Sequence, residues 1–176
     1  LSESEVWYVI GSYFSKYGIV RHQIESFDNF MTTSLPHIVQ ESSEIVLTQG
    51  DTTHVIALCN VSVQKPVIQE CDGYDRPIMP HMARMRSATY ASAVMVDVVH
   101  DIKNPQKHER RVFREVLLCR LPVMVGSLYC HTYKAERVHE CRLDQGGYFI
   151  INGIEKALLA QEKLHTNQAY IFSVKQ

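Results

Sequence analysis

The chain has 176 residues, of which 45% are hydrophobic and 21% are charged, and its formal net charge is -1. This balance is typical of a folded domain with a sizeable core, and it excludes a disordered or fibrous chain. A net charge near zero gives no overall attraction to nucleic acid, so any contact with phosphate has to come from a local patch.

Helices are predicted in the first 40 residues. Ser2 and Glu5 have the spacing of a capping box, and apolar residues follow at helical intervals, so we expect a helix over 3–17. A second helix is expected over 26–33 and a third over 34–40, which carries a proline in its first turn. We expect these helices to pack against the segments that follow.

From residue 44 onwards the sequence is typical of a β-sheet. Runs rich in β-branched residues alternate in polarity, as half-buried strands do. The charged run over 103–115 is expected to decorate an exposed hairpin tip. The sequence therefore predicts an α+β fold, with N-terminal helices packed on a mostly antiparallel sheet. The predicted strand runs are EIVLT, HVIALCNVSV, SAVMVDVV and RVFREVLLCRLP.

The run DQGGYFIINGIEK over 144–156 predicts a tight hairpin. Asn152 and Gly153 lie between two apolar segments, and the two-residue turn that they favour needs a positive φ at both central positions. We expect the returning strand to continue through KALLA at 156–160. The spacing alone indicates a structural hairpin.

Arg84 and Arg86 have two interpretations. In an extended segment their side chains would share one face with Tyr90, and a basic pair beside an aromatic ring suits a nucleic-acid backbone. The alternative is that the guanidinium groups brace loops through carboxylates such as Asp97 or Glu70.

Cysteine and histidine residues give no metal site. Cys130, His131, His139 and Cys141 are of the types that bind zinc, but adjacent Cys-His residues do not easily reach one tetrahedral ion, and no C-x-x-C pair is present. The odd number of cysteines instead predicts free thiols in a reducing, intracellular compartment. No nucleophile elbow, triad pattern or phosphate-binding loop occurs, so we predict no catalytic residue.

No apolar run approaches the roughly 20 residues that a membrane-spanning helix needs, and we expect no membrane partner. The chain begins with Leu rather than Met, and we expect it to be part of a longer protein.

The string GGYFIINGIEKALLAQE over 146–162 resembles a signature of the second-largest subunit of DNA-directed RNA polymerases, in eukaryotic and related enzymes. Three earlier blocks are similar to the same family in the same order, at 18–31, 83–98 and 120–130. Departures from the family pattern suggest a divergent lineage, protist or viral. They fall at Met85, Ser87, Ala88 and Ile154.

In that family this region resembles the N-terminal protrusion beside the nucleic-acid cleft. The resemblance implies a single protrusion-like domain over 1–176 that ends near the point where a second module, the lobe, is inserted. The family's magnesium-binding aspartates lie on the largest subunit, so the resemblance implies no catalytic, metal or cofactor residue here, with magnesium in the assembled enzyme. It makes Lys156 a candidate phosphate contact and Gln161 a candidate polar neighbour of the transcript. The alternatives are a solvated lysine and a glutamine that bonds only the backbone.

The resemblance implies a role in DNA-templated transcription as a wall of the cleft. Its partners would be the largest polymerase subunit, the other subunits, the DNA template and the RNA–DNA hybrid. The location would be the nucleus, or a cytoplasmic factory or virion for a viral enzyme. The alternative function is a free-standing intracellular interaction domain without a polymerase role.

Overall fold

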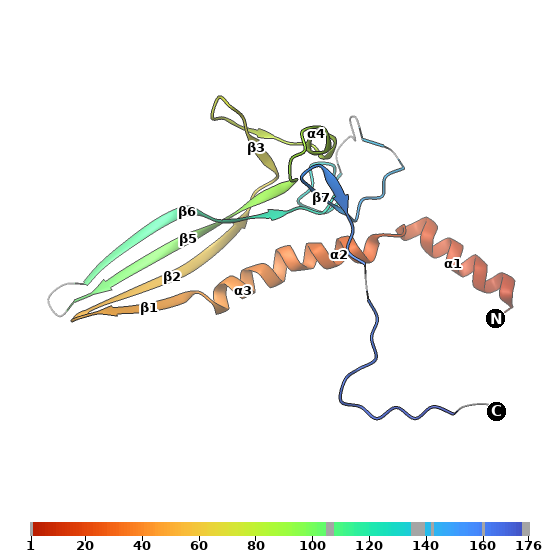
Figure 1. Cartoon of the computed structure of the whole chain (residues 1–176), viewed down its shortest axis with the longest axis horizontal. Coiled ribbons are helices and arrows are strands. Elements are labelled where there is room, and N and C mark those ends of the chain that lie inside the picture. The colour runs from red at the N-terminus through yellow and green to blue at the C-terminus, as the bar shows by residue number, and fades with distance from the viewer. Residues whose placement is uncertain (1, 105–107, 135–139, 142, 160, 174–176) are drawn as a thin grey trace.

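The computed structural model describes residues 2–104, 108–134, 140–141, 143–159 and 161–173. The molecule is elongated, with a sheet that extends as an arm in one direction and a helical run beneath it (Figure 1). We call the outer part of the four-stranded sheet, residues 44–58, 98–104 and 108–113, the arm. We call the short strands, the short helix and the loops at the other end of the sheet the base, which comprises residues 66–90, 122–134, 140–141 and 143–156.

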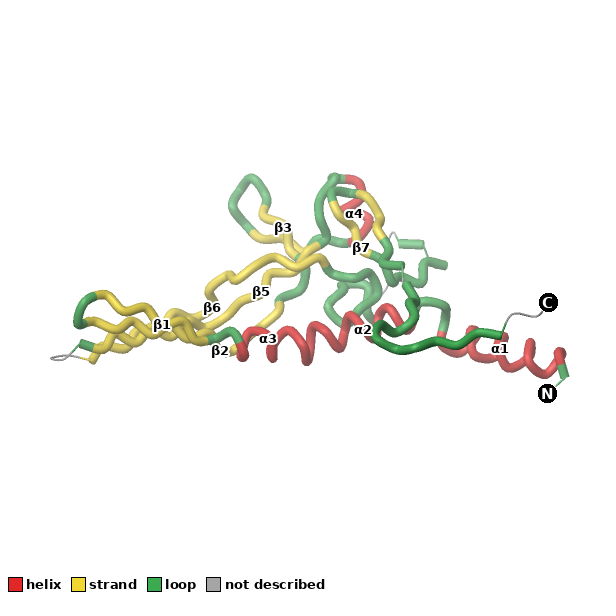
Figure 2. The backbone as a smooth tube through the Cα atoms, turned by 60° about the horizontal axis from the view of Figure 1, so that its bottom comes forward, coloured by secondary structure: helices red, strands yellow, loops and turns green. Residues whose placement is uncertain are grey.

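Helix α1 spans Glu3–Tyr17, as the sequence predicts. The Ser2 hydroxyl accepts from the Glu5 amide and the Glu5 side chain accepts from the Ser2 amide, which completes the predicted capping box. The prediction that this helix packs on the sheet is wrong, because α1 buries none of its residues and points away from the body (Figure 2). The covered face of the sheet is occupied by the next helices instead.

The second and third predicted helices form one nearly continuous run. Helix α2 spans Arg21–Asn29, a π-helical turn η1 spans Phe30–Ser34, and α3 spans Leu35–Glu41. The run starts earlier than predicted. The wide turn, in which the Leu35 amide donates to the Phe30 carbonyl, lets the helix continue through Pro36, which lacks an amide donor.

The sheet is antiparallel with strand order β1-β2-β5-β6, which confirms the predicted fold class. Met31, Leu35 and Val39 of the helical run are buried against Val94 and Val96 of the sheet. The strands are β1 (Glu44–Gln49), β2 (Thr52–Val63), β5 (Ala91–Lys103) and β6 (His108–Pro122).

The charged run predicted for a hairpin tip mostly lies inside a strand. His108, Arg110, Arg111 and Arg114 belong to β6, where all four are exposed, while Lys107 is outside the described residues. The run is mostly exposed to solvent beside a hairpin tip, as expected, but most of it lies in the strand rather than in the loop. The long β5–β6 pairing continues outward as far as Lys103 and His108.

Shorter elements build the base. Strands β3 (Val67–Gln69) and β4 (Asp75–Pro77) form one hairpin, α4 spans Pro80–Met85, and β7 (Phe149–Ile151) pairs with β8 (Ile154–Lys156). Beyond the base, the described residues 161–173 are exposed and have no regular secondary structure. None of the helices in the described part of the chain has the length and hydropathy needed to span a bilayer.

Candidate nucleic-acid interface

The β7–β8 hairpin has the predicted turn. Asn152 and Gly153 have φ values of 51° and 78°, and Ile151 pairs with Ile154 across them. The predicted returning strand is wrong beyond Lys156, where β8 ends. The Leu158 carbonyl instead accepts a hydrogen bond of 2.6 Å from the Gln23 side chain, so α2 takes up this backbone group in place of a strand partner.

Residues 87–90 hold the hairpin from one side. The Tyr90 amide donates to the Ile150 carbonyl at 3.0 Å and the Gly153 amide donates to the Ala88 carbonyl at 3.0 Å. The Asn152 amide donates to the Thr89 hydroxyl, at 3.1 Å. A Cβ atom added at Gly153 would lie 2.8 Å from the Ser87 Cα. The turn therefore needs glycine both for its φ and for this close approach.

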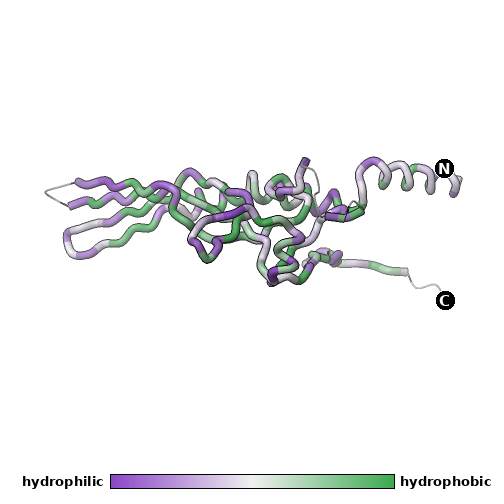
Figure 3. The backbone as a smooth tube through the Cα atoms, turned by 90° about the horizontal axis from the view of Figure 1, so that it is seen from above, coloured by the Kyte–Doolittle hydropathy of each residue, from purple (hydrophilic) through white to green (hydrophobic). Residues whose placement is uncertain are grey.

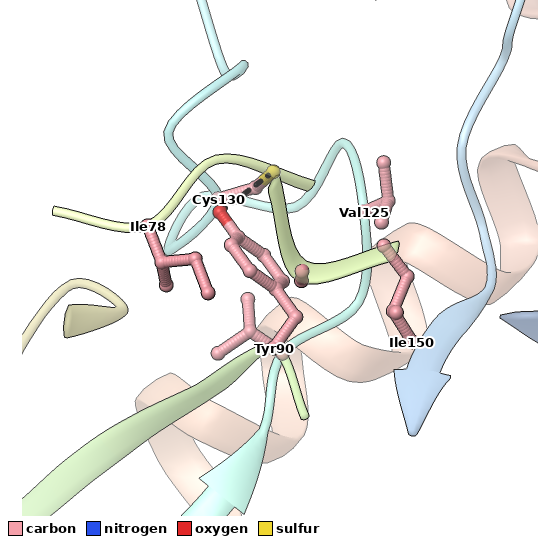
Figure 4. Close-up of a cluster of buried hydrophobic side chains, with 7 residues drawn as sticks. Ile78, Tyr90, Val125, Cys130 and Ile150 are labelled. Atoms are coloured by element: carbon pink, nitrogen blue, oxygen red, sulfur yellow. Dashed lines mark hydrogen bonds between the residues drawn. The ribbon is translucent and has the colours of Figure 1, made fainter. Parts of the chain in front are cut away.

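Tyr90 is the centre of the core under the hairpin (Figure 4). Its ring is fully buried among Ile78, Val125 and Ile150, and its hydroxyl donates to the Cys130 thiol at 3.4 Å. Burial, and then the neighbouring Cys130, raise the pKa of the Tyr90 hydroxyl well above its ordinary value. This tyrosine is a neutral packing residue with a satisfied polar end.

The Cys130 thiol is occupied by hydrogen bonds rather than poised for a metal. Besides Tyr90, it lies 3.1 Å from the Thr132 hydroxyl. Cys141 is exposed, and His139 lies outside the described residues. Within the described ranges, no three His, Cys, Asp or Glu residues are arranged to hold a metal ion.

Arg84 and Arg86 do not share one face of an extended segment. Pro80 begins helix α4, which contains Arg84, and Arg86 caps its end, so the extended interpretation is wrong. Arg86 forms an ion pair of 2.5 Å with Glu70, as the bracing alternative expected. Asp97 is not their partner, since its carboxylate accepts from the Asn60 side chain and the Glu115 amide.

Arg84 ties three segments of the base together. Its guanidinium lies 3.0 Å from Glu140, 2.6 Å from Glu155 of β8 and 2.5 Å from the Tyr148 hydroxyl. Burial lowers the pKa of Arg84, but hydrogen bonds to Glu140, Tyr148 and Glu155 outweigh it and raise the pKa above its ordinary value. Burial and a hydrogen bond to Asp144 likewise raise the pKa of Tyr148. The guanidinium stays charged, and these groups compensate its charge.

Lys156 has a different environment, at the end of β8. It is exposed, and in the described part of the chain no carboxylate lies within ion-pair distance of its ammonium group. It lines an apolar pocket of about 830 Å³ between α2 and the hairpin, together with Phe27, Met31, Phe149 and Leu158. Gln161 is also exposed, in the irregular segment that follows.

The structure brings together the four blocks that carry the resemblance. Gly147 packs on Val20, where an added Cβ would lie 2.7 Å from the valine side chain, and the Gln145 side chain accepts from the Ile19 amide at 2.9 Å. The contacts of residues 87–90 and of Cys130 bring in the other two blocks. All four blocks therefore meet around one hairpin: 18–31, 83–98, 120–130 and 146–162. Sequence reasoning missed this pocket. The only signal for it was the recurrence of apolar residues in 24–31, and this pattern does not indicate which other segment those residues pack against.

The comparisons with known proteins agree on one family. The model of the RNA polymerase beta subunit family matches residues 18–169. The chain is 34% identical over its whole length to DNA-directed RNA polymerase II subunit 2 of Arabidopsis thaliana. It is 37% identical, over 91% of its length, to DNA-directed RNA polymerase subunit Rpo2N of Methanocaldococcus jannaschii. A probable DNA-directed RNA polymerase II subunit RPB2 homolog of Invertebrate iridescent virus 3 is 31% identical over 93% of the chain.

The chain spans only part of each relative. It covers 17% of the Arabidopsis protein, 33% of the archaeal protein and 15% of the viral protein. The family match nevertheless includes all four segments that meet around the hairpin. The chain therefore belongs to the RNA polymerase beta subunit family and matches the N-terminal region of the second-largest subunit of DNA-directed RNA polymerases.

Proposed function

We propose that this chain forms a protrusion-like part of the wall of the nucleic-acid cleft in a DNA-directed RNA polymerase. The observation that carries the proposal is the convergence of four distant segments on the β7–β8 hairpin, which holds Lys156 in the lining of an apolar pocket. In this proposal residues 1–176 are one structural domain, and the lobe is inserted after it. The domain positions nucleic acid and neighbouring subunits without reacting with them.

Lys156 is the proposed phosphate contact. A free, exposed ammonium group at the end of a fixed strand attracts a phosphate without reading base sequence. The hairpin is anchored by hydrogen bonds to Ala88 and Thr89, so its position does not depend on the ligand. Gln161 is proposed as a polar neighbour of the transcript, because its amide can donate to a phosphate or a sugar.

Arg84 and Arg86 are proposed as braces of the interface. Both guanidinium groups have carboxylate partners, and a cation that is already paired has less to gain from a phosphate. Direct contact of either arginine with nucleic acid stays a prediction that the photocrosslinking described below can test at the same time.

Nucleotidyl transfer with magnesium is proposed for the assembled enzyme. The residues that the structure describes do not fit a magnesium site, because Glu140, Asp144 and Glu155 surround the Arg84 guanidinium instead of an open position. The role of this segment is therefore to hold the shape of the cleft. We expect the purified chain to give no template-dependent primer extension, and extension by the chain alone would contradict the proposal.

The proposed partners are the largest polymerase subunit, the other subunits, the DNA template and the RNA–DNA hybrid. The named eukaryotic relative supports a nuclear location, and a viral enzyme would act in a cytoplasmic factory or virion. A free-standing interaction domain is the competing function. It predicts that the protein which contains this chain does not copurify with a largest subunit.

Site-specific photocrosslinking in the assembled polymerase tests the proposal. A photoreactive residue replaces Lys156, and the enzyme is loaded on a labelled template–transcript scaffold. We expect crosslinks to nucleic acid from Lys156, and none from the same replacement at Lys103, which lies at the outer end of β5. Equal crosslinking from both positions, or from neither, would reject Lys156 as a cleft residue. Replacements at Gln161 and Arg86 extend the same measurement.

A further inference from the structure

Two histidines face each other across the central strands of the arm. His54 of β2 and His100 of β5 bring their Nδ1 and Nε2 atoms to within 3.0 Å. The rings are stacked, with centroids 5.2 Å apart and planes inclined by 29°. Both side chains are half-buried, and among the described residues each ring has no other hydrogen-bond partner. The nucleic-acid interface does not use this pair.

The surroundings of the pair are mostly apolar. Arg111 is the charged residue opposite in register, and its guanidinium is 2.8 Å from the Glu109 carboxylate, which offsets its positive charge. The neighbours in register are Leu47 and Ile102 beside His54, and Ile56 and Arg111 beside His100.

We propose that His54 and His100 form a two-nitrogen chelating site for a divalent transition-metal ion of the Ni²⁺, Cu²⁺ or Zn²⁺ class. Two nitrogens that each lie about 2.0–2.1 Å from one ion, at an angle of about 90–110°, are about 2.8–3.4 Å apart. The observed separation of 3.0 Å falls in this range. Imidazole suits these three metals, and water completes the coordination shell.

Binding requires a proton to move but not to leave the pair. In the hydrogen-bonded pair, one of the two facing nitrogens carries a proton. That ring must take the other tautomer, with its proton on the far nitrogen, so that both facing lone pairs are free for the ion. A small rotation of each ring then directs both lone pairs at the ion. Both ligands start from adjacent antiparallel strands, so the chain is already ordered for binding.

The ion would clip β2 to β5 in the half of the sheet that extends away from the helical run. His54 lies one register position inward from the outermost β2–β5 pair, Thr53 with Lys103, and His100 lies three positions inward. Metal binding would therefore stabilise the arm and leave the base unchanged. This inference is independent of the polymerase assignment.

Nuclear magnetic resonance of the chain with NiCl2 tests the site directly. Paramagnetic Ni²⁺ should broaden the ring resonances of His54 and His100 before those of the other histidines, and ZnCl2 should shift the same resonances. His100→Gln and His54→Gln should each weaken Ni²⁺ binding by at least about tenfold, because one imidazole loses the chelate effect.

His165→Gln is the matched control. His165 is exposed, lies outside the sheet and bonds only its own segment, so this variant should bind Ni²⁺ as the parent does. Two separate glutamine variants guard against a folding defect in either one, and circular dichroism checks both. Equal broadening at His165 and His100, or unchanged affinity in either glutamine variant of the pair, would overturn the proposal.

Discussion

The base and the arm bury their apolar residues in different ways. In the base, Tyr90, Val123 and Ile150 are completely buried. In the arm, Leu47 is 55% exposed and Val112 is 53% exposed, and hydrophobic and hydrophilic residues alternate along the strands (Figure 3). The alternation of polarity favours strands in both regions. Only in the base, however, do four segments that are distant in the sequence pack together. The same local pattern can therefore serve a closed core or an open surface.

Glycine substitutions should give the largest contrast between the two regions. Gly153→Val combines left-handed strain with a clash against the backbone of Arg84 and Ser87, and we expect a loss of about 3–4 kcal/mol in the free energy of unfolding. Gly50→Val, in the β1–β2 turn, has the same sign of φ but open space around its Cβ, and should lose only about 1–2 kcal/mol. Chemical denaturation of both variants measures the difference.

Gly153→Asn sharpens this contrast. Asparagine tolerates positive φ, which alone predicts a small loss, but its Cβ would meet Ser87 at the same 2.8 Å. The structure therefore predicts a loss of about 2 kcal/mol, larger than the turn geometry alone indicated. If Gly153→Asn is as stable as the parent, the close approach of the hairpin to residues 84–87 is not maintained in solution.

Removal of Arg84 is the next largest expected effect. Arg84→Met should lower the free energy of unfolding by about 2–4 kcal/mol, because it leaves the buried Glu140 carboxylate without its cation. Arg86→Met removes one half-exposed ion pair to Glu70 and should lose about 0–1 kcal/mol. Thermal melting of both variants provides the comparison. Similar losses for the two would mean that the Arg84 network does not hold the base together.

Valine truncation compares the two parts of the sheet with the same chemical change. Val94→Ala, under the helical run, should lose about 2 kcal/mol, because a fully buried side chain leaves a cavity. Val112→Ala, on the exposed β6, should change stability by less than about 0.5 kcal/mol. The denaturant concentration at the midpoint of unfolding, compared between variants whose free energy has the same dependence on denaturant, measures the two losses. A large loss at Val112 would show that another surface covers the arm in solution.

Lys156→Ala should leave folding almost unchanged and alter only nucleic-acid binding. The parent chain should bind single-stranded or duplex DNA weakly and without sequence preference, and binding should fade with modest salt. The variant should reduce the slope of log affinity against log salt by about 1. Lys65→Ala, an exposed lysine before β3, is the control and should keep the parent slope. Tight, sequence-selective binding at high salt would favour a dedicated DNA-binding module instead.

Local chemistry explains which parts of the fold could be predicted. The capping box at Ser2, the strands and the Asn152-Gly153 turn depend on neighbours within a few residues, and each is present. The wrong predictions depend on distant partners. Arg84 lies in a helix and binds carboxylates far along the chain, and the segment after Lys156 follows Gln23 of α2. No local sequence pattern identifies a partner that lies so far along the chain.

The resemblance located the candidate site without giving its geometry. Lys156 and Gln161 were placed near nucleic acid by family likeness, and the structure adds that Lys156 is unpaired in the described part of the chain and borders a pocket. The pocket itself arises where α2 crosses the hairpin. That crossing is set by packing between segments more than 100 residues apart, a separation illustrated by the hydrogen bond that the Ile19 amide donates to the Gln145 side chain.

The hydrogen bond between Gln23 and Leu158 also orders events during synthesis. It joins residues 135 positions apart, so α2 cannot complete the base until the ribosome has made the last described hairpin. At about 5–20 residues per second, the helix waits for about 7–27 s. The strands of the arm all lie within residues 44–122, which are made before Leu158, so they can pair during this delay. Until then, the α2 residues that line the pocket, Phe27 among them, have no hairpin to pack against.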